Sequence, residues 1–200
     1  MIIGLTGSIA MGKSATADMF RQLKIPVFDA DQAVHQLYAK GGEAAIKIAE
    51  LYPDVMLNGA VDRSRLASKI ANDETVLPEI EKIVHPMVGA LEKQFISTHQ
   101  KAGTKLIVMD IPLLFEAGRT EDVDIIVVVS ATLQQQRERA LKRPGMTAEK
   151  LDFILARQMP DDQKRARADY VIKTDISLED TFEQVKDMVR ELDPAGIADA

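Results

Sequence analysis

MIIGLTGSIAMGKSATADMF, residues 1–20, places a short apolar run, a glycine-containing loop and an amphipathic stretch in immediate succession. The apolar run predicts a strand, and the spacing of Ala17, Phe20 and Leu23 predicts a helix. The loop between them, residues 7–14, fits G-x-x-x-x-G-K-[ST], the phosphate-binding P-loop, and has the strand and helix around it that this motif requires. The opening of the chain therefore predicts a site for a nucleotide phosphate.

Each residue type in this loop has a physical reason. Gly7 and Gly12 allow backbone conformations closed to other residues, so successive N–H groups can point at one anion. The following helix adds its unpaired N–H groups and the positive end of its dipole. Lys13 would reach the β- and γ-phosphates, and the Ser14 hydroxyl is placed to bind Mg²⁺. A Rossmann dinucleotide site is the weaker alternative, because GxGxxG is absent and a Lys-Ser pair replaces it.

Composition restricts the classes of function. The chain has 200 residues, of which 46% are hydrophobic, which predicts one sizeable core. A net charge of −6 argues against general nucleic-acid binding, which needs a positive face, but still allows a small polyanion wherever cations gather locally. The chain has no cysteine, hence no disulfide and no thiolate metal site. There is no signal peptide pattern and no apolar run near the ~18 residues of a membrane span, so we expect no membrane association and a cytoplasmic location.

Strand and helix patterns alternate along much of the chain. Strands are predicted near residue 3 and at Val27–Asp29, Leu106–Asp110, Asp124–Ser130 and Tyr170–Lys173. Helices are predicted at Gln32–Tyr38, Leu133–Arg143, Thr147–Met159 and Leu178–Leu192, and residues 193–200 resemble a frayed tail. This alternation predicts an α/β fold with three layers, in which a parallel sheet of about five strands is covered on both faces.

A long helical block interrupts this alternation from Glu43 to about Gly103. It holds no convincing strand, and it breaks at Pro53, at Asn58-Gly59 and near residue 72. Pro86 is expected at the first position of a helix that reaches about Gln100, because proline is favoured there. We therefore expect the block to form a separate lobe between the second and third strands.

Asp29-Ala30-Asp31 closes the second predicted strand. Two carboxylates two residues apart in extended chain face the same side. One of them could position an acceptor hydroxyl and take its proton, since this proton leaves late in phosphoryl transfer. The alternative is that either aspartate caps the helix that follows. The spacing alone does not choose between Asp29 and Asp31.

Asp110 ends the third predicted strand, where P-loop enzymes place an aspartate that organises Mg²⁺. We expect its link to the metal to pass through water, because Mg²⁺ keeps several waters. As a lone aspartate at a strand end it could also form a turn. His85 could contact a ligand, but a cap before Pro86 is the favoured interpretation.

A basic cluster lies on the predicted helix before Pro144-Gly145 and comprises Arg137, Arg139, Lys142 and Arg143. Arg139 and Arg143 are four residues apart and are expected to share a face. In a chain of net negative charge, such a cluster suggests an element that closes on phosphates. A solvated basic face paired with Glu138 is an equally good interpretation.

Together these motifs resemble the dephospho-CoA kinase family, and the resemblance covers nearly the whole chain in order. A P-loop is shared with many kinases, whereas DAD, HP and PLLFE together are far more selective. The matching stretches are Gly4–Ser14 (GLTGSIAMGKS), Val27–Asp31 (VFDAD), Ile83–Pro86 (IVHP), Asp110–Glu116 (DIPLLFE), the QRxRxxxR run at Gln136, Arg137, Arg139 and Arg143, and Lys164–Ile172 (KRARADYVI).

The resemblance implies ATP-dependent phosphorylation of the ribose 3′-hydroxyl of dephospho-CoA, giving CoA and ADP, with Mg²⁺ as cofactor. It implies Asp31 as the base, with Lys13 and Arg139 assisting the transfer. ATP would be held by Ala10, Met11, Gly12, Lys13, Ser14, Ala15, Arg139 and Arg143. The acceptor would meet Asp31, His85, Pro86, Pro112, Leu113 and Leu114. The core would comprise residues 1–40, 104–135 and 160–192, with an acceptor lobe at 41–103 and a lid at 136–159.

The chain departs from the family pattern at several positions. The family loop usually reads GGIGSGKST, and here Ser8, Ala10, Met11 and Ala15 replace Gly, Gly, Ser and Thr. We expect helix-like dihedrals to tolerate these changes, Met11 to add bulk near the phosphates, and Ala15 to remove a phosphate contact, so that nucleotide affinity is weaker or altered. Ile154 and Thr174 stand where the family often has arginine and asparagine, near the lid or the adenine.

Two other functions remain open at this stage. One is a different small-molecule kinase of the same fold, such as a nucleoside monophosphate kinase. The other is a P-loop nucleotide switch, whose loops are ordered by the γ-phosphate, although the chain shows no guanine-reading NKxD stretch.

Overall fold

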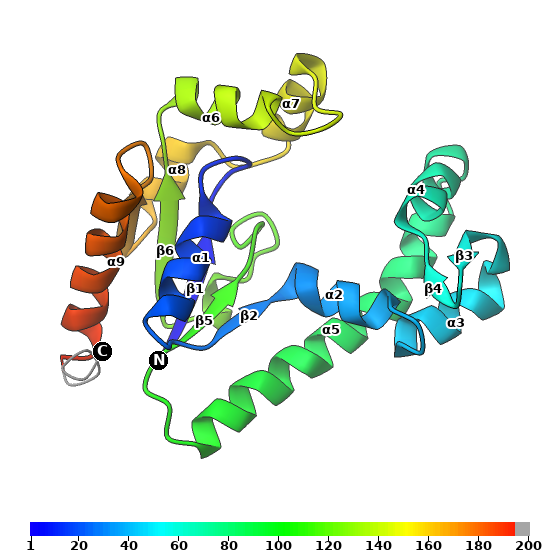
Figure 1. Ribbon diagram of the computed structural model, residues 1–200, viewed down its shortest axis with the longest axis horizontal. Coiled ribbons are helices and arrows are strands. Elements are labelled where there is room, and N and C mark those ends of the chain that lie inside the picture. The colour runs from blue at the N-terminus through cyan, green and yellow to red at the C-terminus, as the bar shows by residue number, and fades with distance from the viewer. Residues whose placement is uncertain (195–200) are drawn as a thin grey trace. The chain divides into compact units, whose positions relative to one another are not determined.

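The central strand of the fold is the one predicted at the N-terminus. In the computed structural model, which describes residues 1–194, β1 (Ile2–Thr6) lies in the middle of a sheet with the order β2-β5-β1-β6-β7 (Figure 1). The other strands are β2 (Val27–Asp29), β5 (Ile107–Asp110), β6 (Ile125–Ser130) and β7 (Tyr170–Lys173). β1 pairs in parallel with β5 and β6, and β6 with β7, so the carboxyl ends of these strands meet at one edge, where α/β folds bind ligands.

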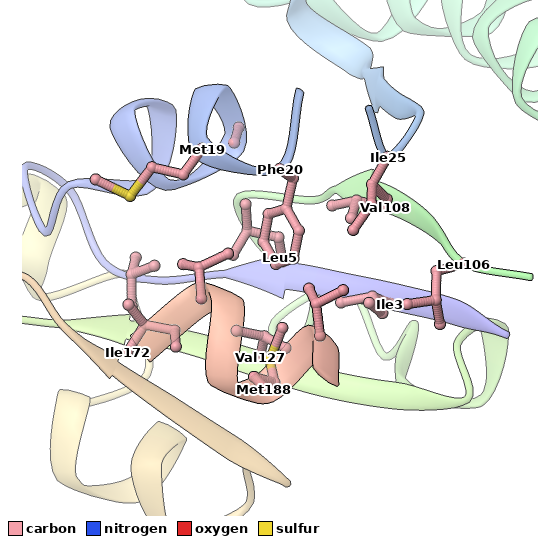
Figure 2. Close-up of a cluster of buried hydrophobic side chains, with 14 of the residues drawn as sticks. Ile3, Leu5, Met19, Phe20, Ile25, Leu106, Val108, Val127, Ile172 and Met188 are labelled. Carbon is pink, nitrogen blue, oxygen red and sulfur yellow. The ribbon is translucent and has the colours of Figure 1, made fainter. Parts of the chain in front are cut away.

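Helices α1 (Lys13–Gln22) and α9 (Leu178–Leu192) cover one face of the sheet. Figure 2 shows Leu5 of β1 and Val127 of β6 packed with Phe20 of α1 and Met188 of α9. Burying each such side chain is favourable by roughly 1.5–3 kcal/mol. Strands β5 and β6 are buried on both faces, because Met109 and Val128, which point to the other face, are also inaccessible. This burial explains why the strands read as continuous apolar runs.

The predicted helix at Thr147–Met159 is wrong in its extent. The structure has α6 (Leu133–Leu141), α7 (Ala148–Leu155) and a further helix, α8 (Asp161–Ala166), that the sequence pattern did not predict. Met159 precedes Pro160, and a residue before proline is disfavoured in helical conformation. A short 3₁₀ turn, η2 (Thr120–Asp122), precedes β6.

The chain forms two compact units, and the second comprises Asp29–Ala102. It contains α2 (Ala30–Tyr38), α3 (Glu43–Leu51), η1 (Pro53–Val55), α4 (Arg63–Asn72) and α5 (Val76–Lys101). Its own core includes Leu37, Ile48 and Ile80. Because Leu37 of α2 packs in this core, the unit begins at Asp29, earlier than the residue 41 expected from the sequence.

A two-stranded hairpin in this unit contradicts the expectation that the block holds no strand. β3 (Met56–Leu57) and β4 (Ala60–Val61) pair in antiparallel fashion. The turn between them is Asn58-Gly59, with φ values of 53° and 81°. Asn-Gly is the pair that a type I′ hairpin turn favours, because both residues tolerate positive φ. The Asn-Gly pair is therefore a hairpin turn, and not only a break between helices.

Pro86 lies inside α5, so the prediction that it begins a helix is wrong, and so is the interpretation of His85 as a cap. Proline has no N–H, so the carbonyl of Lys82 lacks its usual partner at this turn. Val76, Ile80, Val84 and Met87 are buried at helical spacing on both sides of the proline, and their burial outweighs the lost bond. None of the described helices is long and apolar enough to cross a membrane.

Candidate active site

The loop between β1 and α1 needs both of its glycines, each for a different reason. Gly12 has a φ of 94°, and a Cβ there would lie 2.9 Å from Thr174 Oγ1. Gly7 has an ordinary φ, but a Cβ would lie 2.4 Å from the Val129 side chain and 2.8 Å from its carbonyl oxygen. Gly12 therefore provides the left-handed turn into α1, and Gly7 provides a close approach between the loop and β6.

Two expectations about the variable loop positions are wrong. Ala10 has a φ of 62°, so its dihedrals are left-handed, not helix-like, at a cost of roughly 1–2 kcal/mol. It is buried beside Ala140 and Leu151. The Met11 side chain is 1% exposed and belongs to the core, and its Sδ accepts a hydrogen bond of 3.1 Å from Ala131 N–H. Its bulk therefore fills the core behind the loop.

Polar side chains from elsewhere in the chain hold the rear of the loop. The Gln158 side chain accepts from Ile9 N–H at 3.0 Å, and Gln136 donates to the Ile9 carbonyl at 2.9 Å. Thr174 Oγ1 donates to the Met11 carbonyl at 2.7 Å. Gln136 and Thr174 are both buried. None of these three residues was assigned to the loop from the sequence, because each is far from it along the chain.

The front of the loop presents unpaired donors. Helix α1 begins at Lys13, directly after Gly12, and the first-turn N–H groups of a helix have no intrahelical acceptor. Ser14 and Ala15 in this turn are exposed. The N–H groups and the positive helix end are together suited to bind an anion. The arrangement matches a cradle for phosphate oxygens.

The Lys13 ammonium forms an ion pair with Asp110, which ends the neighbouring strand β5. Both side chains are mostly buried. Asp110 thus lies beside the loop, where the sequence pattern placed it, with a lysine as its partner. Mg²⁺ usually binds through one or two carboxylates plus substrate phosphates, so the Ser14 hydroxyl and Asp110 fit such an ion chemically.

Three arginines of the predicted basic cluster, Arg137, Arg139 and Arg143, lie in three different environments. Arg139 is half-buried, and its guanidinium donates to Thr174 Oγ1 at 3.1 Å and to the Thr174 carbonyl at 2.5 Å. Arg137 pairs with Asp152 of α7 at 3.0 Å. Arg143 is exposed and lies beyond the last helical residue, so the prediction that it shares a helix face with Arg139 is wrong. Arg137 therefore has an ion pair with α7, while Arg139 is bound to Thr174, which itself donates to the Met11 carbonyl of the loop.

Asp29 and Asp31 do not share an extended segment, which corrects the prediction that they face the same side. Strand β2 ends at Asp29, and α2 begins at Ala30. The Asp29 carboxylate caps this helix by accepting from Gln32 N–H at 2.9 Å. Asp31 lies in the first helical turn and is exposed, and within residues 1–194 its carboxylate makes no side-chain hydrogen bond or ion pair. The capping alternative thus applies to Asp29.

The segment after β5 contains the remaining predicted residues of the first unit. The Pro112 carbonyl accepts from the Thr6 hydroxyl at 3.2 Å, Leu114 is buried, and Leu113 is exposed. Glu116 forms an ion pair of 2.8 Å with Lys164, which is completely buried. Burial of the Glu116 carboxyl raises its pKa, but the Lys164 ammonium and the backbone N–H groups of Glu116 and Met159 together outweigh burial, so the pKa is lowered. In the second unit, His85 and Pro86 are exposed on α5.

A cavity of about 890 Å³ lies beside the loop, bordered by Ser8, Gln136, Gln158 and the carboxyl ends of β6 and β7. The residues of the phosphate cradle, Lys13 and Ser14, are not part of its lining. The cavity is therefore separate from the front of the loop.

Comparisons with known proteins agree with this geometry. The family model described as dephospho-CoA kinase matches residues 1–180. A curated dephospho-CoA kinase from Rhizobium meliloti is 47% identical over 96% of this chain and 98% of its own length. A curated dephospho-CoA kinase from Bartonella henselae is 50% identical over 96% of this chain and 97% of its own length.

Among solved structures, the crystal structure of TT1252 from Thermus thermophilus superposes with a TM-score of 0.78 at 32% identity, covering 96% of this chain and 97% of that one. Dephospho-CoA kinase from Campylobacter jejuni has the same fold, with a TM-score of 0.69 at 21% identity and 96% coverage of both chains. The fold is therefore the α/β fold of P-loop kinases, as the sequence predicted.

Proposed function

The chain belongs to the dephospho-CoA kinase family, and from that premise we propose how its own residues carry out the family's reaction. The reaction transfers the γ-phosphoryl group of ATP to the ribose 3′-hydroxyl of dephospho-CoA, and it is the final step of CoA biosynthesis. The observation that carries this function is the family match over residues 1–180, joined to a loop that leads directly into the N-terminus of α1.

On the donor side, the first-turn N–H groups of α1 bind the phosphates of ATP, and Lys13 and Ser14 contribute their side chains. Asp110 supports this role because its ion pair holds the Lys13 ammonium at the carboxyl edge of the sheet. When bound, Mg²⁺ neutralises charge on the β- and γ-phosphates. Ser14 would hold it directly, and Asp110 through water.

On the acceptor side, Asp31 acts as the base toward the 3′-hydroxyl. The assignment is supported by the difference between the two aspartates, since Asp29 is engaged as a helix cap and Asp31 is exposed. In the second unit, His85 and Pro86 would contact dephospho-CoA. In the first unit, Pro112, Leu113 and Leu114 would be acceptor contacts of their own. We place the reaction in the cytoplasm.

Residues 136–159 act as a lid, in which Arg139 and Arg143 meet the phosphates of bound ATP. Closure excludes water, which strengthens the attraction between these guanidinium groups and the transferred phosphoryl group. The exposed position of Arg143 leaves its side chain available for such contacts.

The function is tested by measuring ADP release with ATP and a panel of acceptors. Release that requires dephospho-CoA supports the proposal and excludes a nucleotide switch, which would hydrolyse slowly without an acceptor. Phosphorylation of nucleoside monophosphates, with none of dephospho-CoA, would overturn it. Omitting Mg²⁺ with a chelator should abolish release, because the phosphate charge is then not neutralised.

A further inference from the structure

Thr174 lies at a junction of three elements that the reaction uses. It directly follows β7, it is 7% exposed, and it contacts both the loop and α6. Its hydroxyl donates to the Met11 carbonyl at 2.7 Å, whereas the Ser130 carbonyl is more distant, at 3.4 Å. A hydroxyl has one proton, so the shorter bond takes it and a lone pair remains for Arg139.

The direction of this hydrogen-bond chain is fixed by its members. A guanidinium can only donate, so Arg139 donates to Thr174 Oγ1 at 3.1 Å, and Thr174 in turn donates to Met11. The positive charge of Arg139 polarises the hydroxyl and strengthens its bond to the carbonyl. The second guanidinium nitrogen donates to the Thr174 carbonyl, which holds the arginine in place.

The Met11 carbonyl matters because of the peptide bond to which it belongs. In a planar trans peptide, the carbonyl oxygen and the following N–H point in opposite directions. Holding the Met11 carbonyl toward Thr174 therefore turns the Gly12 N–H away from Thr174. In the same way, Gln136 holds the Ile9 carbonyl toward itself, and the Ala10 N–H of that peptide bond therefore points away from Gln136.

Thr174 also fits against the loop by shape. A Cβ at Gly12 would lie 2.9 Å from its Oγ1 and 3.0 Å from its Cβ. The loop backbone thus passes directly over this side chain, and a change in the side chain displaces the backbone donors.

We propose that Thr174 is a positioning residue of the phosphate site. Its hydroxyl links Arg139 to the Met11 carbonyl and so directs the Gly12 N–H toward the bound phosphates. The inference rests on the proposed function of the loop, and it adds to the reaction a residue that itself touches neither substrate.

The test compares Thr174→Val, which keeps the shape and removes the hydroxyl, with Thr174→Ser, which keeps the hydroxyl. Inorganic tripolyphosphate is the probe, because it occupies a phosphate cradle without an adenine. In calorimetric titration, Thr174→Val should bind tripolyphosphate about tenfold more weakly, since a buried carbonyl loses its donor. Thr174→Ser should remain within about threefold of the parent. In kinetics, Thr174→Val should raise KM for ATP and leave KM for dephospho-CoA unchanged.

Thr181→Val is the matched control. Thr181 is buried, and its hydroxyl donates to the Ser177 carbonyl at 2.8 Å, whereas the Lys173 carbonyl is more distant, at 3.3 Å. Neither carbonyl belongs to the loop. This variant should lower the melting temperature and leave tripolyphosphate binding unchanged. If Thr174→Val misfolds, Thr174→Ala provides the same comparison without a new methyl group beside Gly12.

The possible outcomes separate the two proposals. A folded Thr174→Val or Thr174→Ala variant that binds tripolyphosphate as tightly as the parent overturns the role of Thr174 alone. A parent protein that does not bind tripolyphosphate, or binds it equally well after Lys13→Ala, overturns the phosphate site and with it the positioning role. Weak binding in Thr174→Val, restored in Thr174→Ser, supports both.

Discussion

The buried ion pair between Lys164 and Glu116 allows a quantitative prediction for the variant Lys164→Met. The Lys164 side chain is 0% exposed, and that of Glu116 is 17% exposed. Methionine fills the space but leaves the carboxylate without its ammonium. Removing one partner of a fully buried pair costs about 3–5 kcal/mol. Because Glu116 keeps some solvent and its bond from Met159 N–H at 2.8 Å, we expect a loss of about 2–3 kcal/mol.

The assay is thermal and urea unfolding of the full chain. For a protein of this size, each kcal/mol lowers the melting temperature by about 2–4 °C, so the variant should melt about 8 °C below the parent. The matched control is Lys186→Met, since Lys186 forms a surface pair with Glu183 at 2.6 Å on α9. Surface pairs contribute about 0–1 kcal/mol, so this variant should remain close to the parent.

The pH dependence has a definite sign. The pKa of Glu116 is lowered in the folded state, so its stabilising contribution is complete above the ordinary carboxyl pKa and is lost as pH falls through the lowered folded value. The difference in stability between parent and Lys164→Met should therefore shrink in acid. A difference below about 1 kcal/mol at neutral pH, or one that is the same in acid, would refute the reasoning. Lys164→Met/Glu116→Met should recover most of the loss, because no unpaired charge remains.

Three further variants and one matched control test the site. Asp31→Asn should lower kcat by about 10²–10⁴-fold with KM for ATP unchanged, while Asp29→Asn, which can still cap α2, should stay within a few-fold in steady-state kinetics. Lys13→Ala should lower kcat more than it raises KM for ATP, because the ammonium stabilises the charge of the phosphoryl group mainly in the transition state. Equal losses in kcat and in KM would contradict that role. Met11→Ser should lower the free energy of unfolding by about 2–4 kcal/mol, as expected for a truncated core side chain. If this variant binds ATP more tightly and keeps the stability of the parent, the Met11 side chain faces the phosphates after all.

The sheet could be predicted from the sequence because its signals are local. Ile107–Asp110 and Ile125–Ser130 are short continuous apolar runs, and burial on both faces explains that pattern. The positions of Asn58-Gly59 and Pro86 show where local rules are insufficient. Asn58-Gly59 forms a hairpin turn inside a block whose pattern is otherwise helical. Pro86 is tolerated inside a helix because residues on both sides of it are buried in one core.

In the candidate site, too, the part that could be predicted is the part encoded by neighbouring residues. The motif at residues 7–14 identified the front of the loop, since a strand, two glycines and a helix start are encoded within a few residues. The rear of the loop depends on contacts across the chain. Gln136 meets Ile9 across 127 positions, and Thr174 meets Met11 across 163. A glutamine on a helix and a threonine after a strand carry no local signal of such contacts, so only the tertiary structure assigns them.

These rear contacts change the interpretation of the atypical loop. Ala10 adopts a left-handed conformation at a cost of roughly 1–2 kcal/mol that glycine would avoid. Met11 acts in the opposite direction, because its buried side chain anchors the loop to the core and to Ala131. Both effects operate during folding, before any ligand arrives. A loop ordered in advance loses less conformational entropy on binding, which favours affinity. The substitution at Met11 therefore supports a rigid cradle, and the weaker affinity expected from its size does not follow from its position.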